Sequence, residues 1–388
     1  MTLARRMQDI SPFQVMELMG RAKALEQQGR DIVHMEVGEP DFPTSPPVIA
    51  AAQDFLATGK VFYTSALGMP ELREAISDFY RQRYRSHVPA ERIVITTGAS
   101  AALLMALSVL VDRDEEWLLP DPGYPCNANF VRLLEGKVRR IATRAEHGYQ
   151  PTAAQVGEAW GARTKGLLVA SPANPTGTLI GAAHLAELHA AVKEKGGTLL
   201  VDEIYHGLTY GVDAASATML GDDIFVINSF SKYFGMTGWR LGWLVVPPRY
   251  LREVEKLAQN LYISPPTLAQ HAALASFTPQ NITILEERRR EFSRRRDLLL
   301  AGLDEIGFRI TAPPKGAFYV YAEIGSLAED SYALAQALLE EAGVACTPGL
   351  DFGQQDAHRY MRFAYTTEMA RLQEGLRRMQ SFFSRQRL

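Results

Sequence analysis

The chain has 388 residues, of which 47% are hydrophobic and 22% are charged, and its formal net charge is -3. This is the composition of an ordinary globular protein, and the length favours two domains. A slightly negative charge balance gives no reason to expect a nucleic-acid partner. The longest apolar run, about residues 101–111, is too short to cross a bilayer, so no membrane association is expected.

The two cysteines, Cys126 and Cys346, lie far apart in the sequence and in no CxxC pattern. A disulfide framework or a zinc site is therefore not expected, and a reducing compartment fits this usage. His184 and His189 are not spaced to place two ligands on one helical face, and no HExxH motif occurs, so no metal is expected. The N-terminus has two arginines but no apolar core, unlike a signal peptide. The expected location is the cytoplasm.

Between residues 92 and 246, short apolar runs alternate with helical patterns. The runs that predict strands are Arg92–Thr97, Glu116–Leu119, Val138–Ala142, Gly166–Ala170, Thr198–Val201, Ile224–Ile227 and Leu241–Val246. Helices are predicted over Ser100–Val111 and Ala182–Lys195. Continuous apolar strands separated by helices indicate an α/β fold with a mostly parallel sheet sandwiched by helices.

The pattern changes after Leu251, where a long helix is predicted over Ile282–Ile306 with the charged sequence EERRREFSRRRD. Its arginines indicate either a nucleic-acid surface or the solvated face of a helix. Apolar residues such as Leu285 and Phe292 supply an opposite side and favour the second interpretation.

The rest of the chain predicts a smaller α+β domain. Its strands are predicted over Phe318–Tyr321 and Arg359–Phe363, and its helices over Tyr332–Ala342 and Glu368–Ser384. The N-terminal segment, rich in proline and glycine around residues 38–47, is expected to return to this domain. We therefore expect a large domain over residues 45–280 and a small domain made of residues 1–44 and 281–388.

A lysine directly follows one predicted strand, in the sequence SFSKYFGMTGWRLG at residues 229–242. Ligands in α/β sheets bind at the carboxyl ends of strands. Lys232 follows Ser229 and Ser231 and precedes Arg240 by eight residues. Most lysines are solvated point charges, but hydroxyls and a guanidinium beside a lysine suit an anionic phosphate. The spacing alone leaves both interpretations open.

Polar residues also follow two other predicted strands. Asp202 is either a helix N-cap or the partner of a cation, such as a protonated pyridine nitrogen. Tyr205, three residues further on, reaches the same ligand if a helical turn follows. Asn174, in the sequence SPANPTG, is either a structural turn residue or a hydrogen-bond partner for a ligand at the sheet edge.

The turn after the strand Arg92–Thr97 has two functional interpretations. Backbone N–H groups at a helix N-terminus favour anions, and Ser100 adds a hydroxyl. The sequence GASAA at residues 98–102 is also a degenerate nucleophile elbow without its last glycine, in which Ser100 would attack an ester. Such a hydrolase would also need a carboxylate and then a histidine further along the chain, for which residues such as Asp202 and His358 are candidates that no local signature marks.

Taken together, these motifs resemble those of the class I/II aminotransferases, the PLP-dependent enzymes of fold type I in the aspartate aminotransferase superfamily. The resemblance extends from GEPDFP at residues 38–43 to Arg362. Between them, in the family's order, stand YTS at 63–65, GMPELR at 68–73, TGAS at 97–100, DPGYP at 121–125, NPTG at 174–177, DEIY at 202–205, SFSK at 229–232, GWRLG at 238–242 and GAFY at 316–319. One such motif is weak evidence, whereas the whole series in order is specific.

The resemblance implies pyridoxal 5′-phosphate as the cofactor and a role for each matched residue. Lys232 resembles the lysine that carries the cofactor as a Schiff base and afterwards moves the proton. Asp202 is similar to the family's partner for the pyridine nitrogen. Tyr205 and Asn174 resemble the pair that hydrogen-bonds the 3′ oxygen of the ring, and Tyr124 resembles the aromatic residue stacked on it.

The resemblance also implies how the phosphate and the substrate are held. The residues that resemble the phosphate cradle are Ala99 (through its N–H), Ser100, Ser229 and Arg240. Tyr63 resembles the tyrosine that reaches the phosphate of the neighbouring subunit, which implies a homodimer with shared active sites. Arg362 resembles the clamp for the substrate α-carboxylate, with Gly38 and Asn174 close to it.

The activity implied by the resemblance is transfer of an amino group between an L-amino acid and a 2-oxo acid by a ping-pong mechanism. A PLP-dependent lyase of the C–S type on the same fold is the alternative, because the two share active-site residues. A regulator on this fold would need an added N-terminal DNA-binding module, for which the residues before the first motif are too few.

The side-chain pocket is the least defined part of the site. In one aspartate-specific subgroup of the family a lysine stands at the position of Ser100, so that route to aspartate is not expected here. Ile10, Phe13 and Tyr319 are expected to line the pocket, which favours apolar or aromatic substrates.

Overall fold

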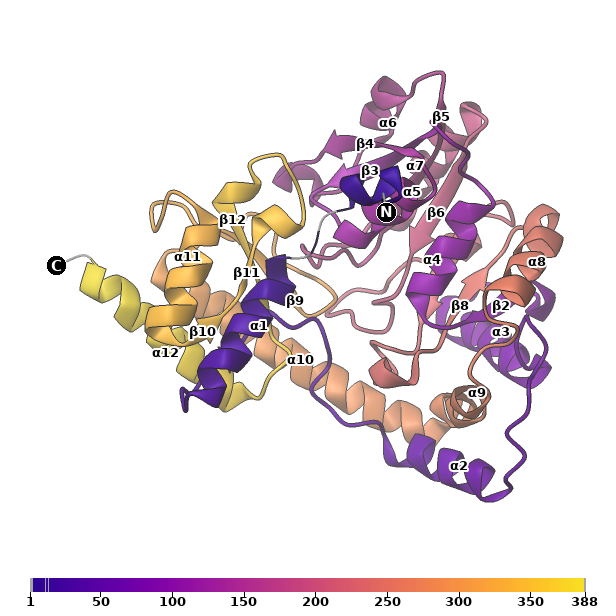
Figure 1. Cartoon of the computed structure of the whole chain (residues 1–388), viewed down its shortest axis with the longest axis horizontal. Coiled ribbons are helices and arrows are strands. Elements are labelled where there is room, and N and C mark those ends of the chain that lie inside the picture. Colours follow the sequence, from indigo (N-terminus) through magenta and orange to yellow (C-terminus); the bar gives the residue numbers. More distant parts are fainter. Residues whose placement is uncertain (1–2, 11, 13, 387–388) are drawn as a thin grey trace.

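Seven strands pair into one large sheet in the computed structural model, which describes residues 3–10, 12 and 14–386 (Figure 1). In order across the sheet they are β2 (Ile93–Thr96), β8 (Gly242–Val245), β7 (Phe225–Ser229), β6 (Thr198–Asp202), β5 (Thr164–Ala170), β3 (Glu116–Asp121) and β4 (Lys137–Ala142). Within this sheet β8 runs opposite to the other strands, which all run in the same direction. The prediction of a mostly parallel sheet is confirmed.

Helices cover both faces of this sheet, which is why its central strands are apolar throughout rather than alternating. They are α3 (Pro70–Tyr84), α4 (Ala99–Ser108), α5 (Pro125–Leu133), α6 (Ala153–Ala159), α7 (Ala182–Glu194) and α8 (Leu251–Leu261). Buried side chains of α4, α5 and α8 pack on one face, and those of α3, α6 and α7 pack on the other. Successive residues of β5, Leu167 and Leu168, join opposite faces, as the period of a strand requires.

A smaller part of the molecule lies on the left in Figure 1 and contains two short sheets. One is antiparallel, with β11 (Thr347–Pro348), β12 (Tyr360–Ala364) and β9 (Tyr319–Glu323) in that order. The other pairs β1 (Val33–His34) with β10 (Val344–Ala345) in parallel. The helices of this part are α1 (Gln14–Gln27), α11 (Ser331–Ala337) and α12 (Met369–Gln386). The pairing of β1 with β10 returns the N-terminal segment to the C-terminal part, as expected.

The long helix α10 (Pro279–Ile306) connects the two parts (Figure 1). Beside its first turns, α2 (Pro46–Ala57) packs against α9 (Thr267–Leu274). Helix α10 begins where the Thr278 side chain accepts the N–H of Asn281, and it ends at Gly307 with φ +114°. Its arginines mostly pair with acids of the same helix, as Arg294 does with Glu291. This supports the solvated-face interpretation of the basic cluster.

The helix predicted over residues 332–342 is in fact divided. The α-helical part, α11, ends at Ala337, and residues 338–342 form a wider π-helical turn before Gly343, which has φ +65°. The apolar pattern continues through both segments, so the pattern alone gives no sign of the change in hydrogen bonding.

Candidate functional site

A cavity of about 440 Å³, which we call the central cavity, lies at the carboxyl ends of the large sheet and reaches the smaller part. Sequence reasoning placed functional residues just after β2, β3, β5, β6 and β7, and the parallel arrangement brings these strand ends to one edge. The predicted residues on its wall are Gly38, Ala99, Ser100, Tyr124, Asn174, Asp202, Tyr205, Lys232, Arg240 and Arg362. Residues assigned from distant motifs therefore meet in one place.

Among the described residues, three that were predicted to belong to the site are not on this wall, namely Ser229, Tyr63 and Ile10. The Ser229 hydroxyl is buried, donates its proton to the Leu241 carbonyl oxygen at 3.0 Å and lies 2.9 Å from the Ser231 hydroxyl oxygen. Tyr63 lies on the connection between α2 and α3 and is 77% exposed. Ile10 is half-buried elsewhere, and Phe13 lies outside the described residues. His358, which a hydrolase would need, is not on the wall that holds Ser100 and Asp202.

The amine of Lys232 is held near the N-terminal segment, because its Nζ donates to the Gly38 carbonyl oxygen at 2.8 Å. The side chain leaves the turn after β7 and its amine lies among protein atoms. This burial lowers the pKa of Lys232 to about 8, and the positive charges of Arg362 and Arg240 act in the same direction. A much larger fraction of this lysine is thus a neutral nucleophile at neutral pH than of an ordinary lysine.

Asp202 closes β6 with its side chain only 5% exposed. Burial raises the pKa of Asp202 to about 6, although its Oδ1 accepts the N–H of Ile204 at 3.0 Å and Lys232 also favours the charged form. A buried carboxylate of this kind is stabilised by a cation placed beside it. The residue therefore serves both as a turn acceptor and as a potential partner for a ligand cation.

An anion cradle forms where α4 begins. Gly98, with φ +88°, precedes the first residue of that helix, and Arg240 comes so close that a Cβ on Gly98 would lie 2.7 Å from its Nη2. Arg240 itself has φ +53° and donates from Nη1 to the Thr237 carbonyl oxygen at 2.9 Å. The free N–H groups of α4, the Ser100 hydroxyl and this guanidinium together suit a phosphate.

Arg362 on β12 is buried and points its guanidinium into the central cavity. It donates from Nη1 to Asn174 Oδ1 at 3.0 Å and from Nη2 to the Glu36 carbonyl oxygen at 2.7 Å, while its buried Nε has no partner. The guanidinium carbon also lies 4.3 Å from the ring centre of Tyr319. Within residues 3–10, 12 and 14–386 it forms no ion pair, so a carboxylate from a ligand is the missing counter-charge.

The approach of the N-terminal segment requires glycine at residue 38. A Cβ there would lie 2.2 Å from the Tyr319 hydroxyl oxygen, which itself lies 2.9 Å from the Tyr205 hydroxyl oxygen. Burial raises the pKa of both phenols, so each keeps its proton at neutral pH and remains a hydrogen-bond donor.

Sequence reasoning missed part of the wall. Ser231 lines the cavity where Ser229 was expected to, and α1 contributes Val15, Met16 and Met19. The alternation of buried and lining residues after β7 was the available signal for Ser231. No local signal marked the residues of α1, because this helix packs on β10 and β11, which lie more than three hundred residues further along the chain.

The donor set fits pyridoxal 5′-phosphate. The cradle at the start of α4 could hold a phosphate, Asp202 could face a ring nitrogen, and the buried amine of Lys232 could bond to an aldehyde. The described residues contain no group of three His, Cys, Asp or Glu side chains that could hold a metal ion. None of the helices over the described ranges is both long and apolar enough to cross a membrane.

Comparison with known proteins agrees with this geometry. Residues 30–379 match the family model described as aminotransferase class I and II. The chain is 38% identical to the valine–pyruvate aminotransferase of Mycobacterium tuberculosis over 379 residues, which is 97% of each chain. A crystal structure of an aminotransferase from Mycobacterium tuberculosis matches with a TM-score of 0.96 at 37% identity, covering 99% of this chain and 100% of that one. The aspartate aminotransferase from Thermus thermophilus with maleate matches with a TM-score of 0.93 at 34% identity, covering 98% and 99%.

The family model covers most of the chain, and the relatives are similar over nearly their whole length. The three relatives reported above are each named as an aminotransferase. The chain therefore belongs to the class I and II aminotransferases, the transaminases that use pyridoxal 5′-phosphate and exchange an amino group between amino acids and 2-oxo acids.

Proposed function

We propose that the central cavity is the active site and that Lys232 and Arg362 act there on one substrate. The observation that carries this proposal is that both side chains line the same cavity. Lys232 has a lowered pKa, and Arg362 is a buried guanidinium without a counter-charge in the described residues. When bound, pyridoxal phosphate links covalently to the amino group and draws electrons away from the substrate Cα. The protein has to orient the substrate, exclude water and move one proton.

Arg362 orients the substrate in this proposal. Its two-pronged guanidinium binds the α-carboxylate, with Asn174 and the backbone near Gly38 fixing the prongs. Lys232 Nζ, held by the Gly38 carbonyl oxygen, is then the base that takes the proton from Cα and later returns it. A neutral amine is required for the first of these transfers, and the lowered pKa supplies it.

The remaining residues hold the cofactor. Asp202 would hold the protonated ring nitrogen, Tyr205 and Asn174 would donate to the ring oxygen, and Tyr124 would contact the ring. Four groups would hold the phosphate, namely the Ala99 N–H and the side chains of Ser100, Ser231 and Arg240. Ser229 contributes indirectly, because its hydroxyl orients that of Ser231.

We propose that the preferred amino donors have apolar side chains. The cavity wall toward α1 consists of Val15, Met16 and Met19, together with Val37 and Phe352. The relative from Mycobacterium tuberculosis is named for valine and the one from Thermus thermophilus for aspartate, so the family accommodates both types.

A single-turnover panel tests this function. The holoenzyme is mixed with valine, leucine, phenylalanine and aspartate in turn, and the conversion of the cofactor to its amino form is followed by its absorbance before pyruvate or 2-oxoglutarate is added. We expect faster conversion with the apolar donors than with aspartate, and full recovery on addition of the 2-oxo acid. Faster conversion with aspartate would contradict the assigned substrate class, and release of ammonia or a thiol would contradict transamination.

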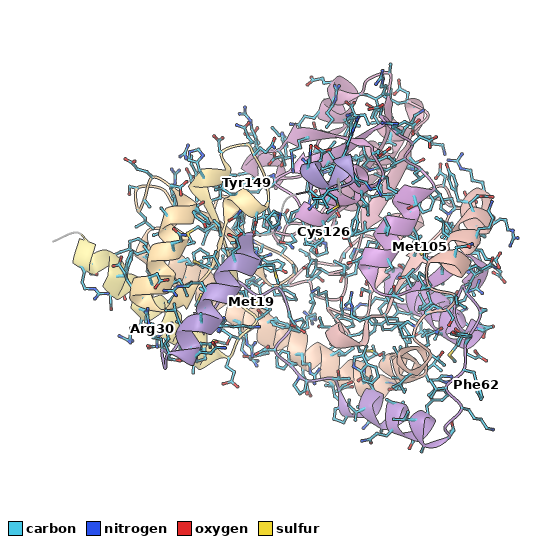
Figure 2. The ribbon with its side chains drawn as sticks, viewed as in Figure 1. Met19, Arg30, Phe62, Met105, Cys126 and Tyr149 are labelled. Carbon is cyan, nitrogen blue, oxygen red and sulfur yellow. The ribbon has the colours of Figure 1, made fainter. Side chains whose placement is uncertain are left out.

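A homodimer with shared active sites is part of the proposal. The connection between α2 and α3 exposes Val61, Phe62 and Tyr63, and Leu261 and Ile263 are exposed as well. Phe62 lies at the outer edge of the larger part, pointing away from the chain's own cavity (Figure 2). Exposed apolar residues gathered on one segment are typical of an interface. Tyr63 would then reach the phosphate in the partner's cavity. Sedimentation velocity should give twice the chain mass, and a monomer would exclude the shared site.

The domain limits and the location are also proposals. The division into residues 45–280 and the two segments 1–44 and 281–388 is supported by the two separate groups of sheets. Limited proteolysis that cuts near these limits would agree with it.

A cytoplasmic location is supported by the free thiols of Cys126 and Cys346, and cell fractionation tests it.

The lowered pKa of Lys232 predicts how fast the cofactor-free protein captures pyridoxal phosphate at different pH values. The protonated amine cannot attack the aldehyde, so the rate should rise with pH and level off above about 8, where Lys232 is neutral. Stopped-flow absorbance after mixing measures this rate. A rate that keeps rising to a pH of about 10, as for an ordinary lysine, would contradict the shift.

A further inference from the structure

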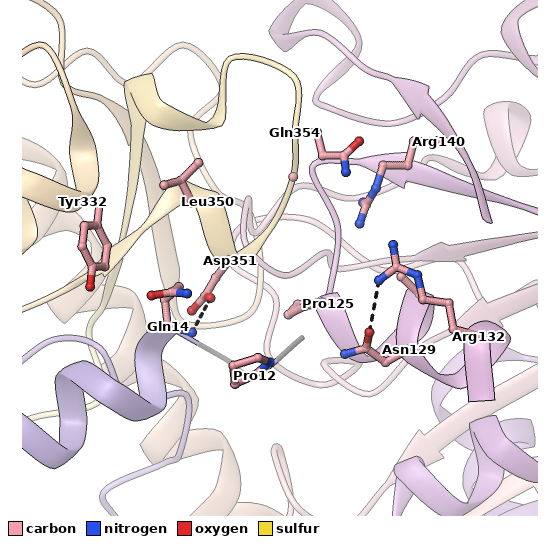
Figure 3. A pocket seen from close by; sticks show the side chains of 12 residues that line it. Pro12, Gln14, Pro125, Asn129, Arg132, Arg140, Tyr332, Leu350, Asp351 and Gln354 are labelled. Atoms are coloured by element: carbon pink, nitrogen blue, oxygen red, sulfur yellow. Dashed lines mark hydrogen bonds between the residues drawn. The ribbon is translucent and has the colours of Figure 1, made fainter. Parts of the chain in front are cut away.

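A second cavity of about 580 Å³, which we call the arginine cleft, opens between the two parts of the molecule (Figure 3). One wall comes from α5 and β4 of the larger part, and the other comes from residues 332–354 of the smaller part. The arginine cleft and the central cavity share Pro125 and Asp351, so the two adjoin. Arg140 also borders a small space whose wall includes Tyr124 and Asn174 of the central cavity.

Two arginines of the arginine cleft have no acidic partner. Arg132 on α5 and Arg140 on β4 direct their guanidinium groups toward each other (Figure 3). In the part of the chain that the structure describes, neither forms an ion pair, and Arg132 only donates to Asn129 Oδ1 at 3.3 Å. Burial lowers the pKa of Arg140, the negative charge of Asp121 opposes this shift, and the positive charge of Arg132 adds to it. Two like charges that point toward each other are stabilised by an anion between them.

The acids near the arginine cleft are already engaged. The two carboxylate oxygens of Asp121 lie 3.2 and 3.0 Å from the backbone nitrogen of Gln354, whose N–H they accept. Those of Asp351 accept the N–H groups of Gln14 and Val15 at 2.7 and 2.8 Å, and burial raises the pKa of Asp351. The charge of Asp121 favours the charged form of Arg140, but over the described residues neither carboxylate forms an ion pair with Arg132 or Arg140, so the charge of the pair is only partly offset.

We propose that Arg132 and Arg140 bind a phosphate dianion carried at the far end of a substrate side chain. Their guanidinium groups come from different elements and point toward each other, and the Gln354 side chain lies beside Arg140 (Figure 3). Donors that converge from several directions suit the tetrahedral phosphate with its three acceptor oxygens, whereas a planar carboxylate needs only one guanidinium fork.

This inference rests on the proposed function, because it takes the substrate α-carboxylate to be held by Arg362. From there the side chain passes the apolar wall of the central cavity and then Pro125 and Asp351 to enter the arginine cleft. Free phosphate in solution offers the same chemistry, so the source of the phosphate has to be decided by experiment.

The test uses the holoenzyme, in which bound cofactor occupies the cradle at α4, and three single variants. Arg132→Gln and Arg140→Gln each remove one charge from the arginine cleft and lie on separate elements. Arg139→Gln is the matched control, because Arg139 is the neighbour of Arg140 on β4, lies outside the arginine cleft and pairs with Glu116 at 2.9 Å. Calorimetric titration with inorganic phosphate measures binding, and kcat/KM for O-phospho-L-homoserine is compared with that for L-homoserine.

We expect inorganic phosphate to bind the holoenzyme and Arg139→Gln equally, and to bind Arg132→Gln and Arg140→Gln about tenfold more weakly or worse. The preference for the phosphorylated donor over L-homoserine should fall by a similar factor in the same two variants only. Phosphate binding that depends on both arginines without any such preference would assign the site to free phosphate. Equal binding by all four proteins, or none, would overturn the site. Loss of turnover with both donors while phosphate still binds would count against the proposed function and not against the site.

Discussion

Replacing Lys232 with alanine should lower kcat by about 10⁴-fold or more, because one residue supplies both the covalent link to the cofactor and the base for the Cα proton. The Nζ–carbonyl hydrogen bond to Gly38 disappears with it, as do the cation–π contact with Phe318 and the electrostatic effect on Asp202. The single-turnover rate with a good amino donor measures the loss. Cofactor content is determined in parallel, so that slow chemistry is distinguished from an empty site.

The matched control is Lys193→Ala. Lys193 lies on α7, pairs with Asp223 at 2.8 Å and is far from the central cavity wall. It should keep the wild-type rate. A Lys232→Ala protein that retains more than a few per cent of the rate, with the control unchanged, would show that another residue moves the proton.

The Arg362→Gln variant should lose about 10²- to 10³-fold in kcat/KM for amino acids, since a buried carboxylate would be left without its charge partner. The rate with a primary amine that lacks the carboxylate should stay nearly the same, because that amine never uses the guanidinium. This difference between two substrates separates loss of the clamp from general damage to the site.

The more conservative Arg362→Lys variant tests the same role of Arg362, as the clamp for the substrate carboxylate. Lysine keeps the charge but loses the planar fork that donates to Asn174 and the Glu36 carbonyl oxygen, so an intermediate loss is expected. Thermal melts check that both variants fold. Equal losses for the amino acid and the carboxylate-free amine would contradict the clamp.

Much of the site could be predicted because parallel strands place their carboxyl ends together. Asp202 ends β6, and Asn174 and Lys232 follow β5 and β7, so apolar runs in the sequence were enough to bring them to one edge. The roles assigned to them came from the resemblance, because a lysine after a strand has no defined chemistry on its own.

Other parts depend on contacts between distant segments and left no local pattern. The pairing of β1 with β10 joins residues more than three hundred positions apart through only two residues on each side. It is this return that places α1 on the wall of the central cavity. The arginine cleft likewise requires α5, β4 and the loop after β11 to meet, and no pattern in the sequence of any of these segments indicates that they do.

Ser229 and Tyr63 illustrate two different limits. The hydroxyl of Ser229, the last residue of β7, faces the Leu241 carbonyl oxygen, whereas Ser231 faces the cavity. Which of the two serines lines the cavity depends on backbone geometry and not on residue type. Tyr63 is exposed and is not on the wall of its own cavity, so the role proposed for it needs a second chain.

The position of the cofactor bond tests the account most directly. The holoenzyme is reduced with borohydride, which makes the bond between cofactor and lysine permanent, and the digested protein is mapped by mass spectrometry. One pyridoxyl group per chain is expected, on Lys232. A pyridoxyl group on any other lysine, with Lys232 unmodified, would contradict it.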